Sequence, residues 1–572
     1  MDPKPWLRNY GAGVPATLEP YPRRTLMDYV TSGARERPAH PALVFHGARL
    51  GYGALERESD ALAAGLAVMG VRKGDRIALL MPNCPQFVLA ELGAWKVGGV
   101  VAPLNPLYSE RELVETLNRV GAETIVTLSR FYPRVLAIRS RTPLKRVIVT
   151  NIKEYLPPAL RVLYTLFREA KAGDRVGVRP GDQSLQRLLR RHAGAPRPAV
   201  AVSPDDAALL LMSGGTTGTP KSVIGLHRGL VASGLQLREW LRPILGEWND
   251  TVLLPLPLFH VYGNAGAQSF ALIGHNPLIL VPNPRDIDDL VKTIQREKPS
   301  VFVSVPALFN ALLNHREVRA GRVDFRSIRG CFSGAAALMA ETKKRFEELT
   351  GGRIVEGYSL TEAMMACAVN PVLGTNKIGS VGMPMPDVEV RIVDEDVGLE
   401  ERETGKVGEV VIRAPQLMAG YWNDPVETRR TLRPLGAGAP WLYTGDLGYL
   451  DEDGYLFIVD RKKDLIKVSG LQVWPREVEE VLATHPAVLD AGVAGVPDER
   501  KGEAVKAWVV LQPGASVTEA ELREHCRASL AAFKVPSAIE FRTELPKTPL
   551  GKVLRRQLRA ESTPKPESAG VA

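Results

Sequence analysis

The sequence has few cysteines, and they are scattered far apart along the chain. Only four of the 572 residues are cysteine, and no two of them form a Cys-x-x-Cys pair. This scarcity excludes a disulfide framework and a cysteine-based zinc site, and it fits a reducing compartment. We therefore expect a cytoplasmic protein.

Long apolar runs are also missing. The first residues, MDPKPWLRNYG, contain no apolar segment of the kind found in signal peptides. No run approaches the roughly 18 apolar residues needed to cross a bilayer. The sequence thus predicts a soluble protein, or one that contacts the inner face of the membrane only peripherally.

The sequence has no long block of residues that carry charge of one sign. The formal net charge is +9, which favours anionic partners such as nucleotides, coenzyme A, carboxylates and anionic lipid. A solvated surface with no partner explains the same net charge equally well. Because no basic tract has interleaved aromatic residues, we do not expect a nucleic-acid partner.

What is present is a chain too long for one hydrophobic core. Between residues 26 and 149, apolar runs such as 77–81 and 124–128 alternate with helical stretches such as 55–69. A further strand is expected at 300–305, with a helix after it. Alternating strands and helices indicate βαβ units and mostly parallel sheets.

Two other patterns follow in the last third of the chain. Residues 387–393 and 408–413 alternate apolar with polar positions, which is typical of half-exposed strands in a smaller β portion. After residue 460, an amphipathic helix at 475–482, a strand at 504–511 and a helix at 519–531 indicate a small α+β domain.

A Gly- and Thr-rich loop follows the apolar strand predicted at 207–212. Residues 212–221 read Met-Ser-Gly-Gly-Thr-Thr-Gly-Thr-Pro-Lys. Glycines let the backbone approach a phosphate, hydroxyls bind oxygen or metal, and Lys221 adds a charge. A Walker A loop needs Gly before its Lys, and Pro220 has no N–H, so a P-loop NTPase is disfavoured. A surface turn without a ligand is as consistent with the loop alone.

The loop resembles the signature of the adenylate-forming superfamily, Ser-Gly-Thr-Thr-Gly-x-Pro-Lys-Gly, and departs from it at Gly214 and Ser222. That superfamily comprises acyl-CoA synthetases, the adenylation domains of peptide synthetases and firefly luciferase. Six further motifs follow in the family's order and cover nearly the whole chain. They are Pro-Leu-Phe-His-Val-Tyr-Gly (257–263), Ser-Gly-Ala-Ala-Ala-Leu (333–338), Glu-Gly-Tyr-Ser-Leu-Thr-Glu (356–362), Tyr-Thr-Gly-Asp (443–446), Asp-Arg-Lys-Lys-Asp (460–464) and Lys-Thr-Pro-Leu-Gly-Lys (547–552).

The resemblance implies an enzyme that activates a carboxylic acid as an acyl-adenylate and passes the acyl group to a thiol. ATP, Mg²⁺ and coenzyme A are the cofactors and co-substrates that it implies. The implied catalytic residues are Lys552, Thr216, Glu362 and His260, with Thr216 and Glu362 as metal ligands. The implied ATP-binding residues are Ser213, Gly214, Gly215, Thr216, Thr217, Gly218, Lys221, Gly334, Ala335, Gly357, Tyr358, Thr361, Asp446 and Arg461.

The resemblance also implies a mobile C-terminal domain. Lys463 would be its hinge residue, and Ser469 and Gly470 would line the route of coenzyme A. The predicted fold is therefore a large α/β N-terminal domain, mostly parallel sheets plus a smaller β portion, with a small mobile α+β C-terminal domain. The predicted boundaries are residues 1–459 for the first domain, 460–464 for the hinge, 465–560 for the second domain and 561–572 for a disordered tail.

Taken singly, these residues have ordinary explanations. An isolated Tyr358 would be a core residue, an isolated Asp446 a turn residue, and an isolated Lys552 a solvated side chain. An isolated His260 would be a satisfied core histidine, and even within the family its role is positional. The ordered series of motifs is what favours the functional interpretation.

Fewer sequence features indicate which carboxylic acid is the substrate. Residues 4–7 (Lys-Pro-Trp-Leu) and the insertion 152–171 resemble bacterial long-chain fatty-acid CoA ligases, whereas Tyr443 departs from that branch. Gly266, Ala267 and Phe270 are candidates for the acyl pocket. A medium-chain or aromatic acid is the alternative, and a non-catalytic acyl- or nucleotide-binding relative is the alternative of another class.

The insertion also bears on the membrane. Leu160, Leu163, Tyr164 and Phe167 are spaced as one helical face, with basic residues nearby. Such a basic amphipathic helix is suited to a membrane surface, and a helix packed on the main domain is equally consistent. Because members of the family are often dimers, a homodimer is a further expectation from the resemblance.

Overall fold

The structure is a computed structural model that describes residues 4–213, 221–336, 338–365, 367–469, 471–498, 500–548 and 551–562. The chain divides into two compact units, which we treat separately. The larger unit comprises Met1–Ile378, Gly382–Glu389 and Arg413–Leu442, and the smaller unit comprises Gly379–Val381, Val390–Ile412 and Tyr443–Ala572.

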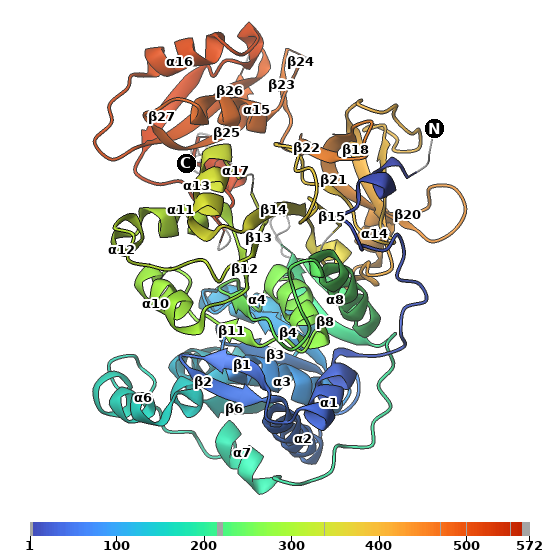
Figure 1. Ribbon diagram of the computed structural model, residues 1–572, viewed down its shortest axis with the longest axis vertical. Coiled ribbons are helices and arrows are strands. Elements are labelled where there is room, and N and C mark those ends of the chain that lie inside the picture. Colours follow the sequence, from blue (N-terminus) through green and yellow to red (C-terminus); the bar gives the residue numbers. More distant parts are fainter. Residues whose placement is uncertain are drawn as a thin grey trace, which may run out of the picture. The chain divides into compact units, whose positions relative to one another are not determined.

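Seventeen α-helices are found in the described residues (Figure 1). They are α1 (Leu26–Glu36), α2 (Tyr52–Val68), α3 (Pro85–Lys96), α4 (Glu110–Val120), α5 (Tyr132–Ile138), α6 (Pro158–Leu163), α7 (Leu185–Arg191), α8 (His227–Leu241), α9 (Ser269–Ile273), α10 (Ile287–Glu297), α11 (Pro306–Asn314), α12 (Arg316–Arg319), α13 (Ala340–Thr350), α14 (Pro425–Thr431), α15 (Pro475–Ala483), α16 (Glu519–Arg527) and α17 (Arg555–Ser562).

The larger unit contains an eight-stranded sheet whose central strands are parallel. Its order is β19-β9-β8-β4-β3-β5-β6-β7, and only the β19–β9 and β9–β8 pairs are antiparallel. Side chains of α4 and α5 pack with those of β3 to β6 in one hydrophobic core. The strands are β3 (Arg76–Leu80), β4 (Val100–Leu104), β5 (Thr124–Leu128), β6 (Arg146–Thr150), β7 (Gln183–Ser184), β8 (Ala207–Ser213), β9 (Lys221–Leu226) and β19 (Gly420–Tyr421).

A nine-stranded sheet forms the other half of this unit. Its order is β16-β15-β14-β13-β12-β10-β11-β1-β2, with parallel pairing from β14 to β1. The strands are β1 (Pro41–Phe45), β2 (Ala48–Gly51), β10 (Val252–Leu254), β11 (Leu278–Leu280), β12 (Val301–Ser304), β13 (Gly330–Ser333), β14 (Arg353–Tyr358), β15 (Ala368–Val369) and β16 (Met383–Pro384).

Helix α3 lies between these two sheets. It contacts β3 and β4 of the first sheet and β1 of the second, and all twelve of its residues are buried. Most of its residues are apolar, as expected for a helix with no solvent-facing surface, and Gln86, Glu91 and Lys96 are the exceptions. Two charged residues of α3, Glu91 and Lys96, are therefore buried inside the unit.

The remaining strands form two smaller sheets. A five-stranded sheet has β17 (Glu389–Val393), β18 (Gly408–Arg413), β20 (Leu432–Arg433), β21 (Trp441–Leu450) and β22 (Leu456–Arg461). The last sheet has β23 (Ile466–Val468), β24 (Leu471–Val473), β25 (Val488–Asp498), β26 (Gly502–Leu511) and β27 (Ala538–Arg542), and α15 and α16 share its hydrophobic core.

The predicted fold class is confirmed: α/β, with mostly parallel sheets, a smaller β portion and an α+β C-terminal part. The strand predicted at 124–128 coincides with β5, and the predicted helix at 475–482 lies within α15. The predicted helix at 519–531 is shorter, since α16 ends at Arg527 and a short 3₁₀ turn follows at Ala532–Lys534. Of the tail expected to be disordered, the first two residues belong to α17, and the others lie outside the described residues.

The insertion at 152–171 is helical, as predicted, but it is not one regular helix. Helix α6 runs directly into a π-helical turn, η5 (Tyr164–Arg168). The apolar side chains of this stretch are exposed: Leu163 by 51%, Leu166 by 67% and Phe167 by 65%. Among the described residues, no helix has the length and apolarity that crossing a membrane requires.

Candidate active site

Strands β8 and β9 bring the two ends of the Gly- and Thr-rich loop together. The two strands pair antiparallel, and Ser213 lies opposite Lys221 in the register. The loop between them therefore starts and ends at one place, as a cradle for a ligand requires. Its predicted phosphate- and metal-binding residues, Gly214, Gly215, Thr216, Thr217 and Gly218, lie outside the described residues.

Lys221 lies in a polar cluster with residues from distant parts of the chain. Its ammonium is 2.5 Å from a carboxylate oxygen of Glu427 in α14 and 5.1 Å from the centre of the Tyr421 ring. The Tyr421 hydroxyl donates a hydrogen bond of 2.9 Å to Oε1 of Glu362. The structure thus brings Lys221 and Glu362, two predicted site residues, into contact with the same tyrosine.

Tyr421 and Glu427 are missing from the sequence prediction. The turn that holds Glu427 is set locally, because its backbone N–H donates to the side chain of the N-cap residue Asp424. Nothing in that local sequence points to Lys221, which is 206 positions away. Only the pairing of β19 with β9 brings the two segments together.

A second group of predicted residues lies at one edge of the nine-stranded sheet. Strands β12, β13 and β14 are parallel, with Ser304 opposite Ser333 and Ser333 opposite Glu356. Gly334 and Gly357 follow directly at the carboxyl edge, where open α/β sheets bind their ligands.

The backbone at this edge has two special features. A Cβ atom at Gly334 would lie only 3.0 Å from the ring of Tyr262, so no larger residue fits there without a shift. Ala335 has φ of 69°, in the left-handed region that alanine rarely adopts. Strain of this kind clusters at ligand sites, which supports the predicted place of Gly334 and Ala335 beside a nucleotide.

His260 is held in its neutral form. Burial lowers the pKa of its imidazole to about 4, and the ring Nδ1 accepts a hydrogen bond of 3.3 Å from the backbone N–H of Tyr262. At neutral pH the imidazole of His260 is therefore uncharged, and it lacks the extra proton that a general acid would give up. A positional role, as expected from the sequence, fits this environment better than general acid catalysis.

The smaller unit brings together two of the predicted ATP-binding residues, Asp446 and Arg461. Asp446 and Arg461 are opposite each other on β21 and β22, and the Arg461 Nε lies 2.8 Å from the Asp446 carboxylate. Asp446 is only 3% exposed, although its carboxylate is an acceptor suited to hydroxyl groups.

Lys552 lies within electrostatic reach of this pair. Loss of solvation and repulsion by Arg461 lower the pKa of Lys552, while the Asp446 carboxylate opposes that shift. Loss of solvation and repulsion by Arg461 likewise lower the pKa of Lys463 to about 8. The predicted site residues Asp446, Arg461 and Lys552 thus interact electrostatically in one region. The predicted hinge residue Lys463 belongs to the same region.

The loop that carries Lys552 is tied at both ends. The backbone N–H of Lys552 donates to the Thr548 hydroxyl at 3.1 Å. The Lys552 carbonyl accepts from the Thr548 N–H at 2.8 Å. Three residues later, Arg555 binds Asp460 at 2.7 Å and Glu479 at 2.6 Å. Arg555 is another residue that the sequence prediction missed, and its two partners hold the start of α17 in place.

The predicted coenzyme A segment is a tight hairpin. Val468 pairs with Leu471, so the connection between β23 and β24 is short and begins at Ser469. Ser469 has φ of 50°, and its N–H bonds the Lys501 carbonyl at 2.8 Å. Gly470 lies outside the described residues.

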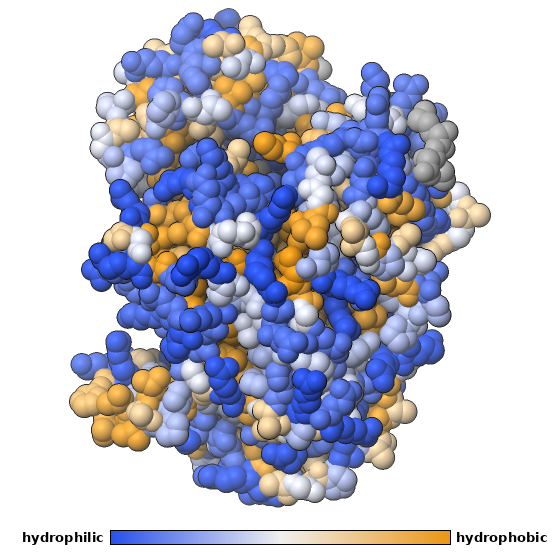
Figure 2. Space-filling model, viewed as in Figure 1, coloured by the Kyte–Doolittle hydropathy of each residue, from blue (hydrophilic) through white to orange (hydrophobic). Residues whose placement is uncertain are grey.

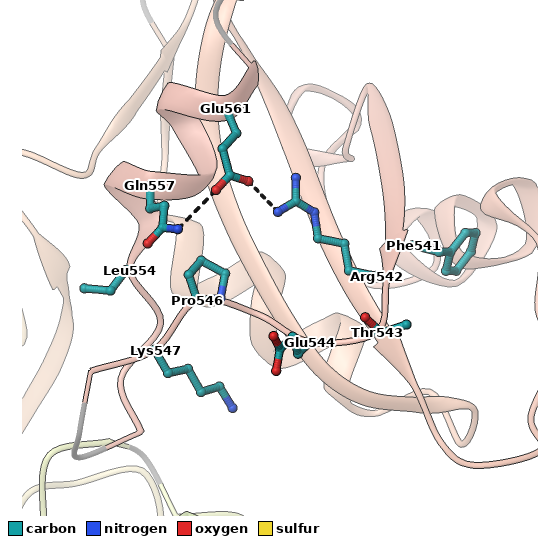
Figure 3. A pocket seen from close by; sticks show the side chains of 9 residues that line it. All are labelled: Phe541, Arg542, Thr543, Glu544, Pro546, Lys547, Leu554, Gln557 and Glu561. Carbon is teal, nitrogen blue, oxygen red and sulfur yellow. Dashed lines mark hydrogen bonds and ion pairs between the residues drawn. The ribbon is translucent and has the colours of Figure 1, made fainter. Parts of the chain in front are cut away.

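A separate hollow of about 720 Å³ lies on the smaller unit between β27 and α17 (Figure 3). Arg542 donates to Glu561 at 2.6 Å, and Gln557 donates to the same carboxylate at 3.2 Å. Lys547 lines the hollow, whereas the predicted ATP, metal and coenzyme A residues among the described ones do not. Its polar groups are largely paired with one another.

The described residues fit Mg²⁺ of the kind that accompanies a nucleotide. Mg²⁺ prefers oxygen ligands and usually binds through one or two carboxylates plus substrate phosphates. Glu362 supplies such a carboxylate, and it shares the neighbour Tyr421 with Lys221. Within the described residues, no group of three or more His, Cys, Asp or Glu forms a cage for a metal, and a site completed by phosphates needs none.

Comparison with known proteins identifies the family. A profile of the AMP-binding enzyme family matches residues 30–422, and one of the AMP-binding enzyme C-terminal domain matches residues 477–552. A long-chain-fatty-acid--CoA ligase of Bacillus subtilis is 38% identical over 98% of both chains, and one of Yersinia pestis is also 38% identical over 98% of both.

Solved structures agree. The crystal structure of the anthranilate CoA ligase AuaEII with anthranoyl-AMP superposes with a TM-score of 0.81, at 27% identity over 94% of this chain and 97% of that one. The predicted resemblance to adenylate-forming enzymes is confirmed, and with it the use of ATP, Mg²⁺ and coenzyme A. The chain belongs to the AMP-binding enzyme family.

Proposed function

We propose that this protein is an ATP-dependent long-chain fatty acyl-CoA synthetase. The acid's carboxylate oxygen attacks the α-phosphorus of ATP, the bond between the α- and β-phosphates breaks, and pyrophosphate leaves. The thiol of coenzyme A then attacks the acyl carbon, loses its proton, and displaces AMP to give the thioester. The observation that carries this proposal is the pair Asp446 and Arg461 on β21 and β22, with which the ammonium of Lys552 interacts electrostatically.

The larger unit would bind the phosphates and the base. Lys221 and the 214–218 loop would hold the β- and γ-phosphates, and Thr216 and Glu362 would hold Mg²⁺. The ion neutralises phosphate charge when bound. Gly334, Ala335, Gly357, Tyr358 and Thr361 would surround the adenine.

The smaller unit would supply the remaining groups. Asp446 would accept hydrogen bonds from the ribose, and Lys552 would neutralise the α-phosphate and the acid carboxylate as they meet. Ser469 and Gly470 would line the path of coenzyme A. We further propose Lys463, within 460–464, as the hinge between domains spanning 1–459 and 465–560.

The long-chain assignment rests on the relatives' names and their similarity. Both relatives described above are long-chain-fatty-acid--CoA ligases and match nearly the full length. The anthranilate ligase is less similar, at 27% identity. An aromatic or medium-chain acid is therefore the second candidate.

The first test is a panel of acids from acetate to oleate, with benzoate included. We expect acid-dependent pyrophosphate release and thioester formation to be greatest with C12–C18 acids. A maximum with short or aromatic acids would overturn the long-chain assignment but keep the reaction. No pyrophosphate release with any acid would contradict the reaction itself and favour a non-catalytic binding protein.

A peripheral membrane contact is a second part of the proposal. The stretch from α6 to η5, residues 158–168, has exposed apolar side chains at Leu163, Leu166 and Phe167. In Figure 2 hydrophobic residues gather at the lower left, where Figure 1 places α6. An exposed apolar group of this size often marks an interaction surface.

The base of this stretch is fixed by buried charges. Asp174 binds Arg130 at 2.6 Å and also accepts from the Tyr164 hydroxyl, and Lys153 binds Glu169 at 2.6 Å. The rigid base presents the apolar side chains outward instead of burying them. Arg161, Arg168 and Lys171 are exposed nearby, which suits an anionic lipid surface.

Vesicle binding tests this contact. We expect the variant Leu163→Ser/Leu166→Ser/Phe167→Ser to bind vesicles of phosphatidylglycerol and phosphatidylcholine at least about tenfold more weakly than wild type, because less apolar surface enters the lipid. Val68→Ser, which removes an apolar side chain 76% exposed on α2, is the control. Equal binding by the triple variant and the control would refute the contact.

We propose a cytoplasmic protein that meets the inner face of the membrane through this stretch. A homodimer is also proposed, on the family resemblance alone. Light scattering of the purified protein at several concentrations distinguishes a dimer from a monomer.

A further inference from the structure

Glu91 is a buried carboxylate that no step of the proposed reaction uses. It lies on α3 between the two large sheets and is completely inaccessible to solvent. Burial raises the pKa of its carboxyl to about 7, and hydrogen bonds from Asn264 and Gln268 oppose this shift. Burying such a group is costly, so its surroundings indicate why the chain keeps it.

Both partners of Glu91 come from one helical turn. Asn264 Nδ2 donates to Oε1 of Glu91 at 2.7 Å, and Gln268 Nε2 donates to Oε2. They lie four residues apart on the π-helical turn η6 (Tyr262–Gln268) and so point to the same side. π-Helical turns are rare and are frequently found at functional sites.

Turn η6 contains Gly266 and Ala267, two candidates for the acyl pocket. Its first residue, Tyr262, holds Nδ1 of His260 through its N–H and packs its ring on Gly334. A Cβ at Gly266 would lie 2.9 Å from the Met365 side chain, so the turn packs closely there as well. A small shift of η6 would move the histidine loop together with Gly266 and Ala267.

Asn264 extends the same network to the loop before His260. Its Nδ2 also donates to the Leu258 carbonyl at 3.2 Å. The backbone N–H of Leu258 is held in turn by the side chain of Asn83 at 2.8 Å. The loop at 254–258 is thus fixed from two directions, and one of them passes through Asn264 to Glu91.

We propose that Glu91 is a positioning residue for the acid substrate, acting through Asn264 and Gln268 on η6. Its carboxylate holds the turn toward α3, which fixes the His260 loop and the positions of Gly266 and Ala267, the candidates for the acyl pocket on η6. This inference rests on that function. It assigns Glu91 no contact with the substrate.

Substitutions at Glu91 separate positioning from simple stability. In Glu91→Leu both amide donors lose their acceptor, and we expect KM for the long-chain acid to rise about tenfold or more, with little change in KM for ATP. Glu91→Gln should restore most of the loss. The side chain of a glutamine can accept a hydrogen bond from Asn264 and donate one to the side-chain oxygen Oε1 of Gln268. That Oε1 atom has no hydrogen-bond partner among the described residues.

Gln86→Leu is the matched control. Gln86 lies on the same helix, is equally buried, and donates to the Asn151 carbonyl at 2.9 Å instead of to η6. We expect Gln86→Leu to change thermal stability but not KM for the acid. If Glu91→Leu does not fold, Asn264→Leu and Gln268→Leu test the same network and should each raise KM for the acid.

The outcomes separate the two proposals. If wild type forms no thioester with any acid, the proposed function fails. If wild type is active but Glu91→Leu, or both η6 variants, keep the acid KM of Gln86→Leu, the role of Glu91 is refuted. Equal rises in KM for acid and ATP would also refute it, because positioning at the acyl side should leave nucleotide binding unchanged.

Discussion

Replacing Lys552 by alanine should slow acyl-adenylate formation by about 10²- to 10³-fold. This is the usual cost of removing one preorganised charge or donor from a developing transition state. The structure places Lys552 near Asp446 and Arg461 on a loop tied to Thr548. Its loss should therefore remove charge neutralisation between two anions while leaving the fold intact. Acid-dependent pyrophosphate release in a single turnover measures the effect.

The second half-reaction provides the internal comparison. When presynthesised acyl-adenylate and coenzyme A are supplied, we expect Lys552→Ala to form thioester within about tenfold of the wild-type rate, since an interaction made only in the first transition state is lost. Lys547→Ala is the control on the same loop, because Lys547 is paired with Asp490. An equal loss in both half-reactions, or an equal loss in Lys547→Ala, would exclude a specific role for Lys552 in adenylation.

Replacing Glu362 by glutamine should reduce adenylation by about 100-fold or more at ordinary Mg²⁺ concentration. Even groups that only support a metal ligand cost about 10- to 100-fold when removed. A neutral amide keeps the shape of Glu362 and its contact with the Tyr421 hydroxyl, so the loss reports charge. We expect the apparent affinity for Mg²⁺-ATP, measured by initial rates over a range of Mg²⁺, to fall with the rate.

The variant Tyr421→Phe tests the same site as Glu362→Gln but with a smaller change. It removes one hydrogen bond to the carboxylate but keeps the ring that faces Lys221. We expect a loss of about tenfold, with the Mg²⁺ dependence shifted in the same direction. Unchanged Mg²⁺ dependence in both variants would contradict a metal-binding role and leave Glu362 as a structural partner of the tyrosine.

Much of the fold was predictable because local sequence decides it. The strand at 124–128 is a buried parallel strand, and such strands are continuous apolar runs whose ends can be read directly. The helix beginning at Pro306 was predictable for a similar reason, since proline fits the first turn of a helix.

The residues around those motifs were not predictable in the same way. Glu427 and Tyr421 reach Lys221 only through the pairing of β19 with β9, and Arg555 reaches Asp460 across 95 positions. The exposed side chains at 163–167 show the same limit, because helical spacing is identical whether a face packs on a domain or meets solvent.

The sequence by itself determined the family, the ordered motifs and the alternation of strands and helices, since each depends on residue type and short spacing. Only the tertiary structure decided that Glu91, on a helix covered on both sides, meets Asn264 and Gln268, and that Tyr421 contacts both Lys221 and Glu362. The physical reason is that these contacts depend on how sheets and helices stack, and the free energy of stacking is shared among many side chains distant in sequence.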